Sequence, residues 1–537
     1  MKKYYTLLTA FLFIYQFAFS QTAPIVAAQK SFGGSRYDQA KVIRKTPDKG
    51  FIVAANTASP TTPGYHGLYD LWIQKFNKKG KVEWSKCYGG SLDDYVIAIE
   101  TTNDNGYIIS GTTTSNDGDV TGHHGVGYDV WVVKIDSVGN IQWSRCYGGT
   151  DYDDEAHIIP TDDGGYLFAA TSGSADGDAT GITGKGGYDV WVVKTSATGT
   201  IEWQKKYGGF DGDFAGSIKK VTGGGYIIGG GTYSNLPGKH GDMQDCYVLR
   251  IDNAGTLLWQ KCYGGTSEEG YANIKNTPDG GFIFVSTASS GDGDVTGVHS
   301  PYEDEFYVYD IWLVKLSAAG AIEWQKVFGG YANDYGEDVQ KTSDGGYIVC
   351  GLAASADGDV VGNHGDGDAW IIKTTSNGTM EWQLCAGGSL NDGAASITSD
   401  FGNGNYIFTG FNMSSDGDCT SNKGGGDVWV VQLAPPATAS LATSGKADAI
   451  TTLINKMYVY PNPVKNTAIV NFVAAKESSY TIAINDINGR EVYRAAYKAT
   501  PGINKVPVNI ANITKGIYFI KLQQGSAVVQ TAKLVKD

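Results

Sequence analysis

One unit recurs seven times through the middle of the chain and constrains its fold more than any other feature. Each copy opens on a Gly-Gly step, which an aromatic residue precedes in six of the seven copies. The spacings between copies are 56, 59, 60, 56, 65 and 58 residues. The first glycines are Gly33, Gly89, Gly148, Gly208, Gly264, Gly329 and Gly387.

The pattern within a unit predicts four short strands separated by Gly, Asp and Asn turns. Segments such as Asp129–Lys134 and Ile141–Arg145 have the β-branched and aromatic residues typical of strands, and so does Tyr347–Cys350. Four strands repeated at this period are typical of a β-propeller. The sequence therefore predicts an all-β fold with a seven-bladed β-propeller over residues 21–434.

The two ends of the repeat region complement each other. Ile25–Phe32 matches only the last strand of a unit, and Asp427–Leu433 matches the third strand and is followed by no fourth. We therefore expect the first strand of the chain to complete the seventh blade, which would remove an exposed sheet edge. An open solenoid is the alternative, but it would not need such matching ends.

Composition supports this fold and narrows the partners. The 74 glycines disfavour long helices, and 12% aromatic with only 18% charged residues excludes a mainly disordered chain. Residues 21–435 carry a net charge of −23, whereas residues 457–537 carry +6. A field of that sign repels phosphate backbones, so nucleic acid is not expected as a partner. The acidic charge suits cations or basic partners, or serves solubility alone.

The amino-terminal segment has the features of a secretory signal peptide. Lys2 and Lys3 precede a mostly apolar run from Leu7 to Phe19, and the run ends on the small-x-small pattern Ala18-Phe19-Ser20. Residues 1–20 are therefore predicted to be removed. No other stretch is long and apolar enough to cross a membrane, so the mature chain is not expected to span one.

Residues 435–456 are rich in Pro, Ala, Thr and Ser and read as a linker. The following residues, 457–537, alternate apolar and polar residues in about seven segments, which predicts a small β-sandwich. Its distinctive residues are the Tyr460-Pro461-Asn462-Pro463 opening, the Gly489-Arg490 turn, the strand with Gly516 and Tyr518, and the close with Lys533.

These motifs resemble the type A C-terminal sorting domain of type IX secretion cargo in the Bacteroidota. The resemblance implies export through the type IX secretion machinery by way of the periplasm, followed by release or attachment to the outer cell surface. An ordinary fibronectin-like sandwich is the alternative, because many unrelated domains share that shape.

The twelve tryptophans all fall on two positions of the repeat. Six stand at the third residue of the third strand of a unit, and six lie in the last strand. Recurrence in blade after blade favours packing between blades, while sugar stacking is the functional alternative. The strand pair around Val130–Trp143 resembles quinoprotein-type repeats, and the Gly-Gly placement resembles kelch blades. Both resemblances concern the scaffold alone.

Acidic residues recur at two positions in every unit. One stands four residues after the second glycine, as Asp94 does, and the other opens the tryptophan strand, as Asp129 does. Presence in all seven units favours a structural role in accepting backbone N–H bonds. An acid and base pair for glycoside hydrolysis is the alternative.

Five units contain an Asp-Gly-Asp loop. Closely spaced carboxylates with a flexible glycine suit Ca²⁺, which prefers oxygen ligands, so calcium is a predicted cofactor of these loops. The alternative is a hairpin loop without metal. The candidate ligands are Asp117, Asp119, Asp176, Asp178, Asp292, Asp294, Asp357, Asp359, Asp416 and Asp418.

The fifth unit is the longest and breaks the repeat with the segment 300–309. Loop insertions into a repeat scaffold often carry function, and this one mixes aromatic and acidic residues that suit a sugar or a basic peptide. A solvated loop with incidental aromatics is the alternative. The candidate ligand-binding residues are Tyr302, Glu303, Asp304, Glu305, Phe306, Tyr307 and Tyr309.

The remaining chemistry-bearing residues give no catalytic motif. Seven cysteines leave at least one unpaired, and buried free thiols are expected. No GxSxG, HExxH or P-loop sequence occurs. The preferred interpretation is a secreted or cell-surface propeller that binds a glycan or protein ligand, with adhesion as one such role. An extracellular polysaccharide-acting enzyme and a purely structural propeller are the alternatives.

Overall fold

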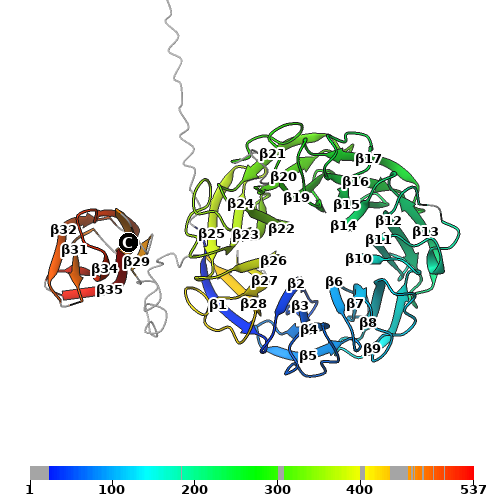
Figure 1. Cartoon of the computed structure of the whole chain (residues 1–537), viewed down its shortest axis with the longest axis horizontal. Helices are drawn as coiled ribbons and strands as arrows, with labels where there is room; N and C mark the ends of the chain where they lie inside the picture. The colour runs from blue at the N-terminus through cyan, green and yellow to red at the C-terminus, as the bar shows by residue number, and fades with distance from the viewer. Residues whose placement is uncertain are drawn as a thin grey trace, which may run out of the picture. The chain divides into compact units, whose positions relative to one another are not determined.

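Seven four-stranded antiparallel sheets surround a central channel in the computed structural model (Figure 1). The chain divides into two compact units, residues 1–437 and 438–537. The structure describes residues 23–182, 184–299, 308–399, 405–435, 457–460, 464, 466–474, 477–487, 489–500, 502–525 and 527–536. The predicted signal peptide and most of the linker lie outside these residues.

Each of the first six blades is formed by four consecutive strands. Blade 1 contains β2 (Asp38–Lys45), β3 (Phe51–Thr57), β4 (Asp70–Phe76) and β5 (Val82–Tyr88). Blade 2 contains β6 (Asp94–Thr101), β7 (Tyr107–Thr113), β8 (Asp129–Ile135) and β9 (Ile141–Tyr147). Blades 3 and 4 are β10 (Asp153–Pro160), β11 (Tyr166–Ser172), β12 (Asp189–Thr195), β13 (Ile201–Tyr207), and β14 (Asp213–Lys220), β15 (Tyr226–Thr232), β16 (Asp245–Ile251), β17 (Leu257–Tyr263). Blades 5 and 6 are β18 (Asn273–Asn276), β19 (Phe282–Ala288), β20 (Asp310–Leu316), β21 (Ile322–Phe328), and β22 (Asp334–Lys341), β23 (Tyr347–Ala353), β24 (Asp368–Thr374), β25 (Met380–Ala386).

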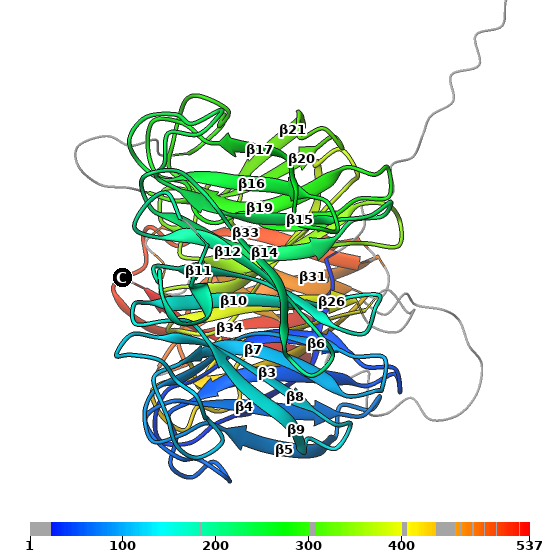
Figure 2. The same ribbon diagram turned by 90° about the vertical axis from the view of Figure 1, so that its right-hand side faces the viewer.

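The first strand of each blade lies next to the channel and the last lies at the rim, as Figure 1 shows. Seen from its side, the ring presents β6, β7, β8 and β9 next to one another in one blade (Figure 2). A single 3-10 turn, Gly177–Ala179, follows β11. The described part of the ring is thus built almost wholly from strands, as the sequence predicted.

The seventh blade joins the two ends of the repeat region. It contains β26 (Asp392–Ser399), β27 (Tyr406–Asn412), β28 (Asp427–Ala434) and, at the rim, β1 (Ile25–Phe32). β1 pairs antiparallel with β28, and Lys30 lies opposite Val430. The prediction that the entering strand completes the last blade is confirmed.

The two tryptophan positions have different environments. The tryptophans of the third strands are buried, and Trp131 donates its indole N–H to Ser144 Oγ at 2.8 Å. Tyr247 takes this position in blade 4 and is also buried. The tryptophans of the last strands reach the next blade, where Trp84 Nε1 donates to the Ser137 carbonyl oxygen at 3.1 Å. Both sets therefore contribute to packing within and between blades.

Neighbouring blades meet at the first glycine of the Gly-Gly step. A Cβ at Gly89 would lie 2.7 Å from Asp70 Oδ1 and 2.8 Å from Asp94 Oδ2, so no larger residue fits between these carboxylates. Asp94 belongs to the next blade, where it accepts a hydrogen bond from the Gly90 N–H at 2.7 Å. Its partner Asp70 is fully buried and its Oδ1 has no hydrogen bond among the described residues. Recurrence of the acidic residues thus reflects a structural role at the junction.

Burial makes these junction carboxylates hard to ionise. Burial first, and then the nearby Asp70 carboxylate, raises the pKa of Asp94 to about 6. The pKa values of Asp129, Asp334 and Asp427 are also raised to about 6, and that of Glu269 to about 7.

The turns between first and second strands hold a contrasting set of aspartates. Burial opposes ionisation of Asp104, but the ammonium of Lys134, 2.8 Å from Oδ2, outweighs it and lowers the pKa to about 2. Five turns share this Asp–Lys arrangement, and in each of them the pKa of the aspartate is lowered to about 2. These aspartates are Asp48, Asp104, Asp163, Asp279 and Asp344.

The carboxy-terminal unit is a sandwich of two sheets. One sheet has the order β29 (Tyr458–Tyr460), β30 (Thr467–Ala474), β33 (Gly502–Asn509), and the other has the order β32 (Glu491–Ala499), β31 (Ser478–Asp486), β34 (Gly516–Gln524), β35 (Ala527–Lys536). Phe472, Ile482 and Ile520 lie in its buried core. The predicted sandwich of about seven strands is confirmed.

The sorting-motif residues that the structure describes lie at turns and strands of this sandwich. Gly489 adopts φ 81° between β31 and β32, and Arg490 follows it. Gly516 begins β34, where the Tyr518 hydroxyl donates to the Thr514 carbonyl oxygen at 2.7 Å. Lys533 lies on β35 and Tyr460 ends β29. Residues 461–463 lie outside the described residues.

Deletion of residues 24–32 should sharply lower the melting temperature of the propeller. The deletion leaves blade 7 with three strands and exposes the edge of β28. Calorimetry of the deletion variant beside the intact chain measures the effect. An unchanged melting curve would show that the ring does not depend on β1.

The propeller should be most stable at about pH 4, where both sets of carboxyl groups contribute fully. The junction carboxylates have folded-state pKa values above their unfolded values, so the stability they contribute is fully present below about pH 4 and is lost as pH rises from there through about 6 to 7. The turn aspartates have lowered values, so their contribution is lost as pH falls below about 4 toward 2. Melting temperatures measured from pH 3 to pH 9 test this, and a maximum at pH 8 would contradict the junction assignment.

Candidate ligand site in the central channel

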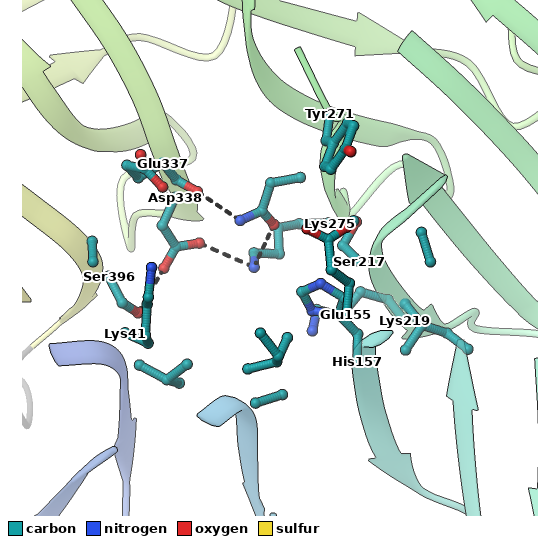
Figure 3. Close-up of a pocket in the computed structure, with 18 of the residues that line it drawn as sticks. Lys41, Glu155, His157, Ser217, Lys219, Tyr271, Lys275, Glu337, Asp338 and Ser396 are labelled. Carbon is teal, nitrogen blue, oxygen red and sulfur yellow. Dashed lines mark hydrogen bonds and ion pairs between the residues drawn. The ribbon is translucent and has the colours of Figure 1, made fainter. Parts of the chain in front are cut away.

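A cavity of about 400 Å³ lies among the first strands of the blades. All seven blades contribute residues to its lining (Figure 3). The contributors, one from each blade in order, include Lys41, Glu100, Glu155, Lys219, Lys275, Glu337 and Ser396. The channel is therefore the one described cavity that the whole ring builds together.

The residues that face this cavity do not follow the repeat. In every blade, the penultimate residue of the first strand pairs with the second residue of the second strand. The seven penultimate residues therefore occupy equivalent positions. β18, which is shorter, follows the same rule with Lys275. The seven residues are Arg44, Glu100, Ile159, Lys219, Lys275, Gln340 and Thr398, of which Arg44, Glu100, Lys219 and Lys275 line the cavity. Two residues earlier stand Val42, Ala98, His157, Ser217, Asn273, Asp338 and Ser396.

Two ion pairs connect neighbouring blades across the channel wall. Arg44 Nε lies 2.9 Å from Glu100 Oε1, and Lys275 Nζ lies 3.0 Å from Asp338 Oδ1. Burial opposes ionisation of Glu100, but Arg44 outweighs it and the pKa of Glu100 is lowered. Lys275 and then Arg44 likewise lower the pKa of Asp338 against the effect of burial. Both carboxyl groups are therefore ionised at neutral pH.

Unpaired basic groups lie beside these pairs. Burial, and then the Lys275 ammonium, lowers the pKa of Lys219 to about 7. Burial, followed by Lys219 and Lys275, lowers the pKa of His157 to about 3, so this imidazole is neutral at physiological pH. His157 and Lys219 lie on the same side of the cavity in Figure 3. This part of the channel thus holds a lysine and a histidine that have no charged partner among the described residues.

Glu155 occupies a strained position in the channel wall. Its φ of 53° is in the left-handed region, and unlike the other two non-glycine residues of this kind, Lys49 and Asn105, it belongs to a strand. The register of β10 is irregular between Asp154 and His157. Burial and the Asp154 carboxylate raise the pKa of Glu155 to about 7, and its Oε2 is buried without a hydrogen bond. Strain of this kind is often found at functional sites.

The Asp-Gly-Asp loops have the same backbone-binding role in each of the five blades. Asp117 Oδ1 accepts a hydrogen bond from the Ser91 N–H at 2.7 Å, and Gly118 between the aspartates has φ 63°. The loops with Asp176, Asp292, Asp357 and Asp416 bind the equivalent N–H groups. Within the described ranges, no three His, Cys, Asp or Glu side chains are grouped so as to hold a metal ion. Calcium binding at these loops stays a prediction.

The loop histidines face the junction aspartates. His66, His124, His240, His299 and His364 each place Nδ1 within 3.4 Å of the aspartate that opens the following strand. All seven cysteines are free and buried, as expected. These residues therefore belong to the scaffold.

Most of the predicted ligand-binding insertion lies outside the described residues. This applies to Tyr302, Glu303, Asp304, Glu305, Phe306 and Tyr307. Tyr309 is described, and its hydroxyl donates to Glu268 Oε2 at 3.0 Å while its ring lies 5.9 Å from that of Tyr335. Tyr335 lines the channel cavity, so the end of the insertion is next to a channel residue.

Sequence analysis did not identify the channel residues. The search for recurring positions drew attention to the residues that the blades share, and these form the scaffold. The signal that could have found them is variation. At some positions of the first strand the residue type changes from blade to blade, although every blade keeps that strand.

Comparison with known proteins identifies the carboxy-terminal unit. Residues 458–537 match the family described as the secretion system C-terminal sorting domain. This domain belongs to the type IX system and implies export to the cell surface or secretion. No helix in the described residues is long and apolar enough to cross a membrane.

Similarity to other known proteins is more distant. The chain is 26% identical over 233 residues to the regulatory protein FlaEY of Caulobacter vibrioides, a match that covers 40% of this chain and 24% of that protein. The chain thus spans about a quarter of that relative's length. The WD40 domain of Neurospora crassa Pan2 aligns at 11% identity and TM-score 0.40, covering 74% of this chain and 90% of that one. Puromycin hydrolase aligns at 12% identity and TM-score 0.43, covering 95% and 63%.

Removal of residues 457–537 should leave a folded propeller that accumulates in the periplasm. The sorting domain is a separate compact unit, so its loss removes the export signal while the ring keeps its contacts. Immunoblots of periplasmic, surface and medium fractions from the native host measure the distribution. Normal amounts of truncated protein outside the cell would contradict this role for the domain.

Proposed function

We propose that this chain is an exported β-propeller binding protein whose ligand, a glycan or a protein segment, binds in the central channel. One observation carries the proposal: the residue types that line the channel vary from blade to blade, on a scaffold that otherwise repeats. A binding site needs such asymmetry, because a ligand of ordinary shape does not have sevenfold symmetry. The ion pairs and unpaired charges described above supply the polar groups that would orient it.

Roles such as adhesion or scavenging follow naturally from an exported binding domain. The insertion at residues 300–309 is the second candidate region for ligand contact, since Tyr309 packs beside the channel residue Tyr335. Its aromatic residues would add apolar contact surface to such a site.

An extracellular enzyme acting on polysaccharide is the second candidate function. The observation that favours it is Glu155, whose pKa of about 7 leaves a fraction of the carboxyl protonated at neutral pH. A protonated carboxyl in a channel can serve as a general acid toward a glycosidic oxygen. Release of reducing sugar by the wild-type chain, lost in Glu155→Gln, would favour this function over binding alone.

Filling the channel should abolish ligand binding without unfolding the ring. Ala395 is half-buried and lines the cavity, so Ala395→Trp would occupy space that a ligand needs. The full exported chain, labelled and applied to glycan and protein arrays, should bind one class of ligand and lose at least tenfold in affinity with this substitution.

The matched control is Ala254→Trp, which adds the same side chain at an exposed rim turn outside the channel. It should bind as the wild type does. Equal binding by both variants would place the ligand site outside the channel, and the insertion at residues 300–309 would then be the region to replace next.

A further inference from the structure

Among the seven equivalent penultimate positions of the first strands, three hold a cation and one holds a carboxylate. Arg44, Lys219 and Lys275 are the cations, and Glu100 is the carboxylate. Glu100 pairs with Arg44, and Lys275 pairs with Asp338 two residues earlier on the neighbouring blade. Arg44 and Lys275 therefore each have a carboxylate within 3.0 Å.

Lys219 has no such partner. Among the described residues it forms neither a hydrogen bond nor an ion pair, and its neighbours in the ring of equivalent positions are Ile159 and Lys275. The titratable groups that act on it from the other strands are Lys275 on β18, Glu100 on β6, Arg44 on β2 and Asp338 on β22. Two of these are cations whose charges their own partners already balance. Lys219 is thus the one cation of these equivalent positions that has no carboxylate partner, in a cavity that Lys41, Glu155 and Glu337 also line.

A single negative charge would balance this site. A carboxylate carries one charge and two oxygen acceptors, whereas a phosphate monoester carries close to two charges near neutral pH. The cationic end of the channel therefore fits a monoanion better than a dianion. A bound carboxylate would also reverse the repulsion that Lys219 experiences from Lys275 and Arg44.

The rest of the cavity supplies acceptors and aromatic surface. The side chains of Glu155 and Glu337 line it, and neither forms a hydrogen bond or ion pair among the described residues. Tyr271 and Tyr335 line it as well. Unengaged carboxylates accept hydrogen bonds from hydroxyl groups, and tyrosine rings pack against the apolar face of a sugar. A ligand that combines one carboxylate with several hydroxyls on a flat ring meets all of these groups.

We propose that the channel binds a uronic-acid-containing glycan, with the carboxylate of one uronate on Lys219 and its hydroxyl groups toward Glu155 and Glu337. This rests on the proposed function, in which the channel is the ligand site, and it adds the chemical class of the ligand. A neutral glycan and a peptide are the alternatives that the following test separates from it.

The test is a calorimetric titration of the full exported chain with oligogalacturonate and oligoglucuronate, and with neutral oligogalactose of the same length. The uronate oligomers should bind and the neutral oligomer should bind at least tenfold more weakly. Affinity for uronate should fall as pH rises from about 6 to about 8, because Lys219 loses its proton over this range. Acetate should compete more effectively than inorganic phosphate.

Variants assign the effect to one side chain. Lys219→Met should weaken uronate binding by tenfold or more, whereas Lys219→Arg should restore affinity. In both variants the fall in affinity from pH 6 to pH 8 should be smaller than in the wild type, because only the ionisation of Glu155 still contributes to it. Lys326→Met, at an exposed rim position, is the matched control and should bind as the wild type does. Circular dichroism of each variant confirms that the ring is folded.

The results separate this proposal from the one on which it rests. Loss of glycan binding in Ala395→Trp but not in Lys219→Met would keep the channel as the site and overturn the uronate assignment. Unchanged binding in both variants would overturn both proposals. Equal affinity for neutral and uronate oligomers, no binding of either uronate by the wild type, or preferential competition by phosphate would each show that the ligand is not a uronate.

Discussion

The junction between neighbouring blades is the contact on which the rest of this ring depends. At each junction a carboxylate from either blade approaches the same glycine, and at Gly89 the space left is too small for a Cβ. The two carboxylates bind backbone N–H groups of the loops beside them, so they fix how one blade follows the next. Seven repetitions of that geometry, closed by β1 against β28, leave an open channel on the axis.

This arrangement explains why the scaffold could be predicted from sequence. Gly89, Asp94 and Trp131 recur in equivalent places because each junction and each blade core imposes the same requirement. Repetition turns a weak local signal into a strong one, so the number of blades, the role of Ile25–Phe32 and the separate sandwich all followed from the chain alone. The Asp-Gly-Asp loops were equally visible, and the structure engages their first aspartates with backbone N–H groups.

The channel could not be found in the same way. Lys219, His157 and Glu155 stand at positions where the blades differ, and a comparison of repeats treats such positions as noise. Their significance depends on distances between residues that are up to several blades apart in sequence. The strain at Glu155 and the absence of a partner for Lys219 are also properties of the folded backbone, which no short sequence pattern encodes.

The scaffold and the channel thus use charge in opposite ways. The junctions suppress the charge of buried carboxylates, as the raised pKa of Asp94 shows, whereas the channel retains cations and pairs Arg44 and Lys275 with carboxylates but not Lys219. An ammonium without a carboxylate partner inside the ring would attract an anionic ligand. The repeated junctions between blades would hold that ammonium in place before any ligand arrives.

The most direct test of this account is the protonation of Lys219 itself. Lysines labelled by reductive methylation with ¹³C-formaldehyde give resolved methyl resonances, and Lys219→Met identifies the one that belongs to Lys219. The account predicts that this resonance titrates at about pH 7 in the free protein and at higher pH when a uronate is bound. Titration at about pH 10, together with the surface lysines, would show that the channel holds no uncompensated cation.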